Sequence, residues 1–206
     1  MKQLFMRMFR AVFGIVLALA AIPALAGGPT DQLKQTIDSV LAILNDPGLK
    51  KAERRKLIRD AADKRFDWAA MARSAMGIYW RERTSEEKRE FSRLFTDLIE
   101  NSYMHKIEGY SGEKIRYHGD STDDGYGAVK VSIITHKGTE IPMTYWVTEK
   151  KGTWLIYDVS INGVSMVNNY RSQIRNIMAN SSYEELVEKL KAKLETARLH
   201  ENKVLR

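Results

Sequence analysis

The sequence predicts an α+β fold in which helices cover a curved antiparallel sheet of about four strands. Apolar residues recur at helical spacing in the first half of the chain, the period changes to two between residues 113 and 162, and helical spacing then resumes. A chain of 206 residues, 44% of them apolar, can bury a sizeable single core. The absence of cysteine excludes a disulfide scaffold, thiol catalysis and a Cys-ligated zinc site.

The first 26 residues have the pattern of a cleaved secretory signal. Lys2, Arg7 and Arg10 make a positive start, an apolar stretch follows, and Ala24-Leu25-Ala26 is a small-x-small cleavage pattern. The apolar stretch spans only about 18 Å as a helix, which is short of the roughly 30 Å core of a bilayer. We therefore expect residues 27–206 to be one mature domain that leaves the cytoplasm.

The charge of the mature chain is mildly positive. The signal holds three basic and no acidic residues of the 33 and 26 in the whole chain, so residues 27–206 carry a net charge of +4. This excess is far below that of nucleic-acid-binding proteins, and secretion also argues against a nucleic-acid partner.

Four helices are expected before the sheet and two after it. A turn at 45–48 ends the first helix, Asp67 can cap the third, and Thr84 with Glu87 forms a capping box for the fourth, which ends near Gly109. The expected bounds are about 33–44, 50–64, 68–79, 84–109, 166–180 and from 182 onward.

The strands are expected between residues 113 and 162. Apolar residues alternate with mostly polar ones over 115–117, 129–133, 141–147 and 155–161, and Asp124-Gly125, Lys137-Gly138 and Lys151-Gly152 supply the hairpin turns. One face of this antiparallel sheet is apolar, and only the helices can cover it.

Catalytic and metal-binding residues show no known arrangement. Asp120–Gly125 resembles the start of a calcium loop, but its twelfth position is Val131 instead of a bidentate Glu. Ser165 lacks the second glycine of a nucleophile elbow, which favours a joint between a strand and a helix. His105, His118, His136 and His200 lack the paired spacing of a metal site. We expect no catalytic site, no metal and no resident cofactor.

Apolar and aromatic side chains of the helices and the sheet are expected to face each other. By residue count they form a filled core. A strongly curved sheet roofed by helices can instead leave a cavity, and methionine suits a wall that must fit ligands of uneven shape. The sequence does not measure that space.

Two blocks of sequence carry a resemblance to a known family. The first contains Phe66-Asp67-Trp68, Met71-Ala72-Arg73 and Gly77-Ile78-Tyr79-Trp80. The second runs from Trp154-Leu155-Ile156-Tyr157-Asp158-Val159 through Ile161-Asn162-Gly163-Val164-Ser165-Met166-Val167 to Asn169-Tyr170-Arg171-Ser172-Gln173. With their separation and the signal, these blocks resemble the MlaC family, also called the toluene-tolerance family, of periplasmic phospholipid-binding proteins.

The resemblance implies a soluble, non-enzymatic carrier that moves glycerophospholipids between the outer and inner membranes and so maintains outer-membrane lipid asymmetry. It implies a sheet similar to nuclear transport factor 2-like folds, with acyl chains between sheet and helices and the head group near the mouth. The implied partners are the phospholipid cargo, an outer-membrane lipoprotein associated with porins, and the substrate-binding subunit of an inner-membrane ABC transporter.

The candidate lipid-binding residues come from both layers of the expected fold. They are Trp68, Met71, Met76, Tyr79, Phe91, Phe95, Leu98, Tyr117, Val131, Met143, Tyr145, Val147, Tyr157, Val164 and Tyr170. The basic residues around Lys50–Lys56 are further candidates for contact with anionic head groups or acidic partners, although such runs are more often a solvated helix face.

Two other functions stay open. The chain can be a periplasmic enzyme with the same type of sheet that uses carboxylates such as Asp120 and Asp158, or an adaptor with a filled core and no ligand. Asp158 and Arg171 lie in the second block, where they are more simply interpreted as residues that fix the joint after the last strand than as lipid contacts.

Overall fold

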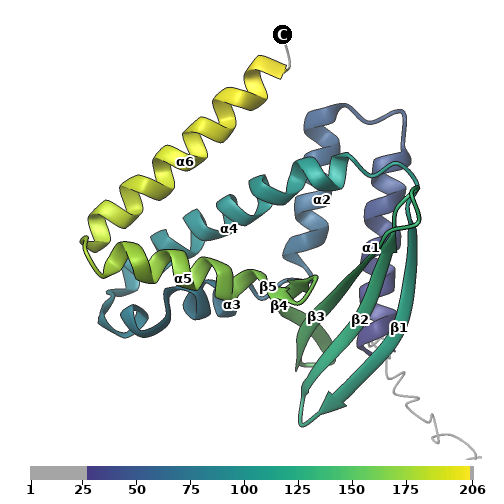
Figure 1. Cartoon of the computed structure of the whole chain (residues 1–206), viewed down its shortest axis with the longest axis horizontal. Coiled ribbons are helices and arrows are strands. Elements are labelled where there is room, and N and C mark those ends of the chain that lie inside the picture. Colours follow the sequence, from purple (N-terminus) through teal and green to yellow (C-terminus); the bar gives the residue numbers. More distant parts are fainter. Residues whose placement is uncertain (1–26, 205–206) are drawn as a thin grey trace, which may run out of the picture.

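Six α-helices and one sheet make up residues 27–204, which are the residues that the computed structural model describes (Figure 1). The helices are α1 (Pro29–Asn45), α2 (Lys51–Asp63), α3 (Trp68–Met76), α4 (Ser85–Glu108), α5 (Met166–Met178) and α6 (Tyr183–Val204). The predicted signal at 1–26 lies outside the described residues. No helix between residues 27 and 204 combines the length and the apolar character that a membrane crossing needs.

The sheet is an antiparallel meander in the order β1-β2-β3-β4-β5, which confirms the predicted α+β class. Its strands are β1 (Lys114–Asp123), β2 (Tyr126–Ile134), β3 (Glu140–Lys150), β4 (Thr153–Ile161) and β5 (Val164–Ser165). Four long strands were expected, and the two-residue β5 is an addition. The β1–β2 turn has positive φ at both Asp124 and Gly125, so the Asp-Gly pair acts as the predicted hairpin signal and not as a cation loop.

Two irregularities in the strand pairing bend the sheet. The β1–β2 register shifts between Tyr117 and Gly119, and the β3–β4 register shifts between Trp146 and Val147. An extra residue on one strand bends that strand and increases its twist. The alternation of side chains therefore changes phase within β4, where a strict period of two was expected.

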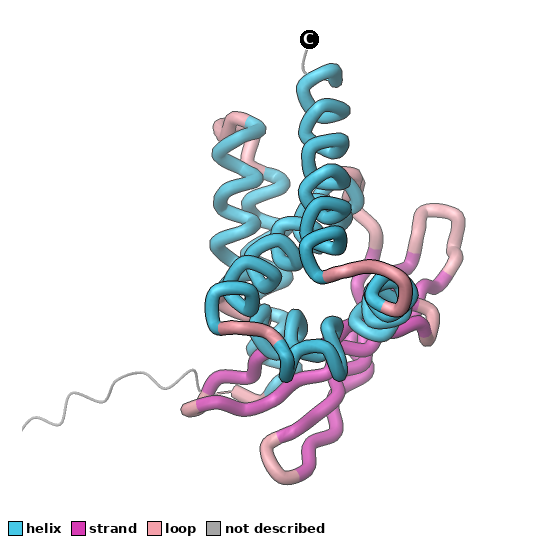
Figure 2. Tube along the Cα trace, turned by 90° about the vertical axis from the view of Figure 1, so that its left-hand side faces the viewer, coloured by secondary structure: helices cyan, strands magenta, loops and turns pink. Residues whose placement is uncertain are grey.

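The helices gather mainly on one side of the sheet (Figure 2). α1 lies against β1, β2 and β4, whereas α3 and α5 pack against β4, and α4 packs between α3 and α6. One core runs through these layers, with buried residues from α1, α3, α4, α5, α6 and the three central strands. The helices thus cover the apolar face, as the sequence analysis expected.

Buried polar contacts anchor the first turns of α1 to β4. The side-chain oxygen of Gln32 accepts from Arg65 Nη1 at 2.7 Å and from the Trp154 backbone N–H at 3.0 Å. Arg65 Nη1 also donates to the Trp154 carbonyl at 2.8 Å. Burial lowers the pKa of Arg65. This network holds the start of α1 on the sheet.

Local signals explain where the helices begin and end. Asp67 accepts from the Ala70 N–H at 3.1 Å, and Thr84 with Glu87 forms the predicted capping box at the start of α4. α3 ends at Met76, three residues earlier than expected, because Gly77 adopts φ +61 and the chain continues as a 3-10 helix, η1 (Gly77–Glu82).

Candidate functional site

Five apolar side chains on the inner face of the sheet pack against the core but stay only half-buried. We call them the inner strip: Ile115, Tyr117, Met143, Tyr145 and Ile161. Tyr117 lies opposite Val131, which lies opposite Met143, which in turn lies opposite Ile161, so most of the strip forms one row across the sheet. Large apolar side chains on a covered face normally lose nearly all of their exposed surface. The helical cover is therefore incomplete over the five strip residues, although Val131 in the same row is fully buried.

Residues of α1 continue the inner strip on the facing side. Ile37 is half-buried against the same core, and α1 also lies against β1 and β2. The Lys34 ammonium lies 6.0 Å from the centre of the Tyr117 ring and pairs with Asp38 at 2.5 Å. An ion pair with no net charge therefore lies where the inner strip meets solvent.

Three of the predicted lipid-binding residues, Tyr117, Met143 and Tyr145, meet on the inner strip. Eight others lie fully inside the packed core: Met71, Met76, Phe91, Phe95, Leu98, Val131, Val147 and Tyr170. Phe95 makes ring contacts with Phe91 and Tyr170 at centroid distances of 5.8 and 5.6 Å. The part of the interior between α3, α4 and α5 is thus filled by side chains, as the simpler interpretation of the sequence expected.

Trp68 and Tyr79 are half-buried at the margin of this packed region. Trp68 stacks on Phe66 with 4.8 Å between ring centroids, and its indole N–H donates to Asp63 at 2.8 Å. These contacts give Trp68 a structural role at the start of α3.

The expectation that Tyr157 points inward is wrong, and Val164, which was also predicted to bind lipid, lies outside the core as well. Tyr157 is the extra residue at the β4 bulge, between the pairs Trp146–Asp158 and Val147–Ile156, and its ring contacts the exposed Tyr126. Val164 is 63% exposed on β5. The bulge turns Ile156 inward in place of Tyr157, which strict alternation does not predict.

Ile37, Ile115 and Ile161 were not nominated as site residues. Strand alternation places Ile115 and Ile161 on the apolar face, but it does not separate them from the other apolar residues of that face. Incomplete burial distinguishes the inner strip from the core, and no pattern in the sequence reports burial.

The two tyrosines of the inner strip are neutral at physiological pH. Burial raises the pKa of Tyr145 to about 12, with a smaller effect from Tyr117, and burial also raises the pKa of Tyr117 to about 12, with a smaller effect from Asp38. Both phenols therefore act as O–H donors in an otherwise apolar surface.

A hollow of about 720 Å³ lies between α2, α4 and α6, away from the inner strip, and has a charged lining. Arg59 Nε lies 3.3 Å from a Glu100 carboxylate oxygen within it. Burial raises the pKa of Glu100 to about 7, an effect that Arg59 opposes and Asp63 and Asp97 reinforce. Because most of its lining is charged, this groove does not suit acyl chains.

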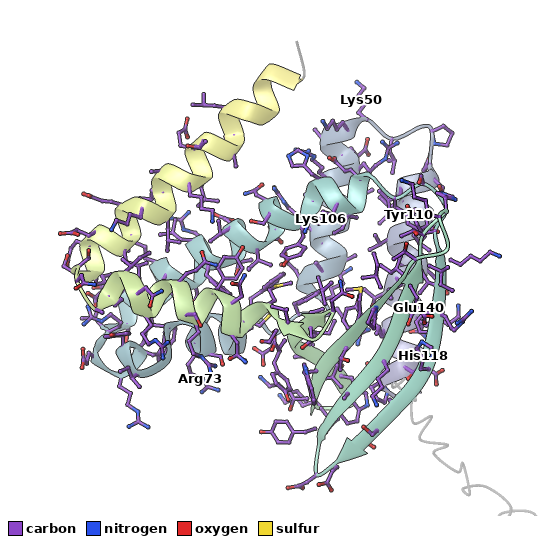
Figure 3. The ribbon with its side chains drawn as sticks, viewed as in Figure 1. Lys50, Arg73, Lys106, Tyr110, His118 and Glu140 are labelled. Carbon is purple, nitrogen blue, oxygen red and sulfur yellow. The ribbon has the colours of Figure 1, made fainter. Side chains whose placement is uncertain are left out.

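Many of the basic side chains on the helices have acidic partners. Arg55 donates to both oxygens of Glu108 at 2.5 and 2.7 Å, and Lys56 pairs with Asp60 at 2.6 Å. Lys50, by contrast, is exposed just before α2 (Figure 3). The pairing favours the interpretation of this run as a helix face.

Asp158 and Arg171 hold the backbone of the second block. Asp158 accepts from the backbone N–H groups of Val159 and Val167 at 2.8 and 3.0 Å, and from the Ser165 hydroxyl at 2.5 Å. Arg171 donates to the carbonyl and the hydroxyl of Ser74 at 2.6 and 2.5 Å. Ser165 also caps α5, so this segment is the strand-to-helix joint that the sequence predicted.

No group of three or more His, Asp or Glu side chains within residues 27–204 is arranged to hold a metal ion. His118 bonds Ser132 at 2.8 Å and lies 3.7 Å from Glu140 on the sheet (Figure 3), whereas His136 bonds Ser111 at 3.1 Å. These histidines therefore have separate, local partners.

Comparison with known proteins assigns the chain to a family. The family model of the MlaC protein matches residues 34–192, which include the inner strip and most of the helical cover. The chain belongs to the MlaC family. This confirms the resemblance carried by the two sequence blocks.

Individual relatives agree with this membership. The chain is similar to the intermembrane phospholipid transport system binding protein MlaC of Haemophilus influenzae, with 29% identity over 97 residues, which are 45% of each chain. It is also similar to the toluene tolerance protein ttg2D of Pseudomonas putida, with 24% identity over 174 residues, or 80% of this chain and 81% of the relative.

A solved structure of a phospholipid-binding protein shares the fold. The phospholipid-binding protein of Ralstonia solanacearum, determined in complex with a phospholipid, superimposes with a TM-score of 0.75 at 22% identity and covers 84% of this chain and 99% of its own.

Proposed function

We propose that this MlaC-family protein is a periplasmic carrier that binds a glycerophospholipid and moves it between the outer and inner membranes. The observation that carries the proposal is the inner strip, an apolar row that faces the helices yet remains half-buried. The phospholipid bound to the Ralstonia solanacearum protein of the same fold supports it.

The energetics of the cargo require such a surface. A lipid with two chains of about sixteen carbons has roughly 28 methylenes, and at ~0.8 kcal/mol each their exposure to water costs on the order of 20 kcal/mol. A carrier must replace the hydrocarbon of the membrane with its own apolar side chains. Head-group hydrogen bonds, at about 1–3 kcal/mol each, cannot compensate for exposed chains.

The packed core restricts where the chains can lie. Met71, Phe91 and Phe95 have no exposed surface, and the rings of Phe91 and Phe95 stack with 5.8 Å between their centroids. In the proposed carrier the acyl chains enter between the inner strip and α1, where side chains already retain exposed surface. Release then requires a partner that opens this space or offers a competing apolar path.

The proposed partners are a porin-associated lipoprotein of the outer membrane and the substrate-binding subunit of an inner-membrane ABC transporter. Membership in the MlaC family is what supports both partners. They can be tested by measuring lipid transfer from the loaded protein to each purified partner.

Mass spectrometry of the mature protein under native and denaturing conditions tests the proposal. We expect phospholipid to be released in about stoichiometric amount when the protein unfolds. A protein that carries no lipid and extracts none from vesicles would instead support the adaptor. Turnover of an ester or glycoside that one carboxylate substitution abolishes would support the enzyme.

A further inference from the structure

The hydroxyl of Tyr117 is buried in the inner strip without a hydrogen-bond partner among residues 27–204. Tyr145, two strands away on the same face, has a hydroxyl that reaches only the Met143 sulfur, at 3.9 Å, among those residues. Sulfur is a weak acceptor. Two phenol O–H donors thus point into an apolar surface with little to bond.

A buried phenol without an acceptor lowers the stability of the protein unless another group accepts its hydrogen bond. A buried hydroxyl without a partner costs about 1–3 kcal/mol, whereas phenylalanine would fill the same space without that cost. Either an internal water or an oxygen of a ligand can accept the bond. The location within the proposed chain-binding surface favours the ligand.

The surroundings indicate which oxygen this is. Lys34 and Asp38 beside Tyr117 pair with each other and leave no net charge at the edge of the strip. A phosphate would lose its hydration here without gaining a counter-ion, because Lys34 is already paired. A neutral carbonyl needs no counter-ion and accepts a hydrogen bond from a neutral phenol.

We propose that Tyr117, assisted by Tyr145, donates a hydrogen bond to an acyl-ester carbonyl of the bound glycerophospholipid. The proposal rests on the proposed lipid carriage and adds a specificity to it, namely recognition of the ester linkage between glycerol and acyl chain. The phenols fix how deeply the chains enter, while the head group stays outside the strip.

A competition between ester and ether lipids tests this specificity. The protein is freed of lipid by unfolding, refolded, and mixed with vesicles that contain equal amounts of dipalmitoyl phosphatidylglycerol and its dihexadecyl ether analogue. Denaturing mass spectrometry then gives the ratio of the two lipids bound. We expect the wild type to prefer the ester about five- to tenfold, which corresponds to one hydrogen bond.

Tyr117→Phe should remove most of this preference and leave the stability of the lipid-free protein unchanged or higher. Tyr157→Phe is the matched control, because Tyr157 packs outside the core, and it should retain the wild-type ratio. An unchanged ratio of ester to ether lipid in Tyr117→Phe would show that the hydroxyl donates its hydrogen bond to water and not to the lipid.

The wild-type ratio alone keeps the proposal testable if the variant fails to fold. Equal uptake of ester and ether lipid overturns ester recognition while leaving the carrier function standing. Uptake of neither lipid overturns the proposed function itself, and the ester recognition with it.

Discussion

Met143→Trp tests whether acyl chains lie against the inner strip. Met143 lies in the cross-strand row between Val131 and Ile161, and its side chain is half-buried. The larger indole should take the place of roughly three chain methylenes, which at ~0.8 kcal/mol each amount to about 2.4 kcal/mol. The partition of lipid from vesicles into the protein should fall about 60-fold.

Two neighbouring substitutions make this experiment specific. Thr144→Trp adds the same indole at the next residue of β3, whose side chain points to the opposite face, and it should leave lipid uptake unchanged. Val147→Trp changes a residue that is 2% exposed within the packed core, so it should lower the free energy of unfolding by about 1–3 kcal/mol through overpacking.

Lipid uptake is measured by mass spectrometry after incubation with vesicles, and stability by urea unfolding of the lipid-free protein. Met143→Trp should change the free energy of unfolding by less than about 1 kcal/mol, because the half-buried site has room for the larger group. Wild-type uptake by a folded Met143→Trp protein would refute the assignment of the inner strip as the wall of the site.

Two further predictions concern the supports of the fold. Glu100→Gln should raise the free energy of unfolding at pH 8 by up to about 3 kcal/mol but should not raise it at pH 4.5. Burial raises the pKa of Glu100 in the folded protein from 4.5 to about 7. The wild type therefore loses stability as the pH rises between these two values, because the buried carboxyl must then ionise. Urea curves at the two pH values measure this, and equal stabilities at pH 8 would contradict it. Asp158→Asn should cost about 1.5–3 kcal/mol, because a neutral amide with one carbonyl oxygen replaces a carboxylate that accepts three hydrogen bonds. Thermal unfolding measures that cost. The Asp158→Asn protein should keep the wild-type preference for ester lipid.

In the proposed carrier, lipid exchange must also be compatible with the anchoring of α1 on the sheet. The Gln32–Arg65–Trp154 network fixes the first turns of α1, whereas farther along the helix Ile37, Leu41 and Leu44 are only half-buried. Opening at this second part of α1 exposes less buried surface than separation of the helix at its anchored start. The space for exchange is therefore expected beside the inner strip.

Local signals in the sequence were enough to predict most elements of the fold. The Thr84–Glu87 capping box, the Asp124-Gly125 turn and the Ser165 joint each depend on residues that lie within a few positions of one another. Because their hydrogen bonds close over short stretches of chain, residue type and spacing determine them. The family resemblance was likewise readable from two continuous blocks.

The candidate site depended on contacts between distant segments, which the tertiary structure decided. The bulge at Tyr157 arises from pairing between β3 and β4, and it reversed the inward and outward positions that alternation predicted. Met143 and Val147 are both apolar residues of one strand, yet one is half-buried and the other belongs to the packed core. Among the described residues, the Tyr117 hydroxyl has no hydrogen-bond partner because of what α1 and β3 place around it. Burial is a sum over neighbours from the whole chain, so residue type and spacing alone do not specify it.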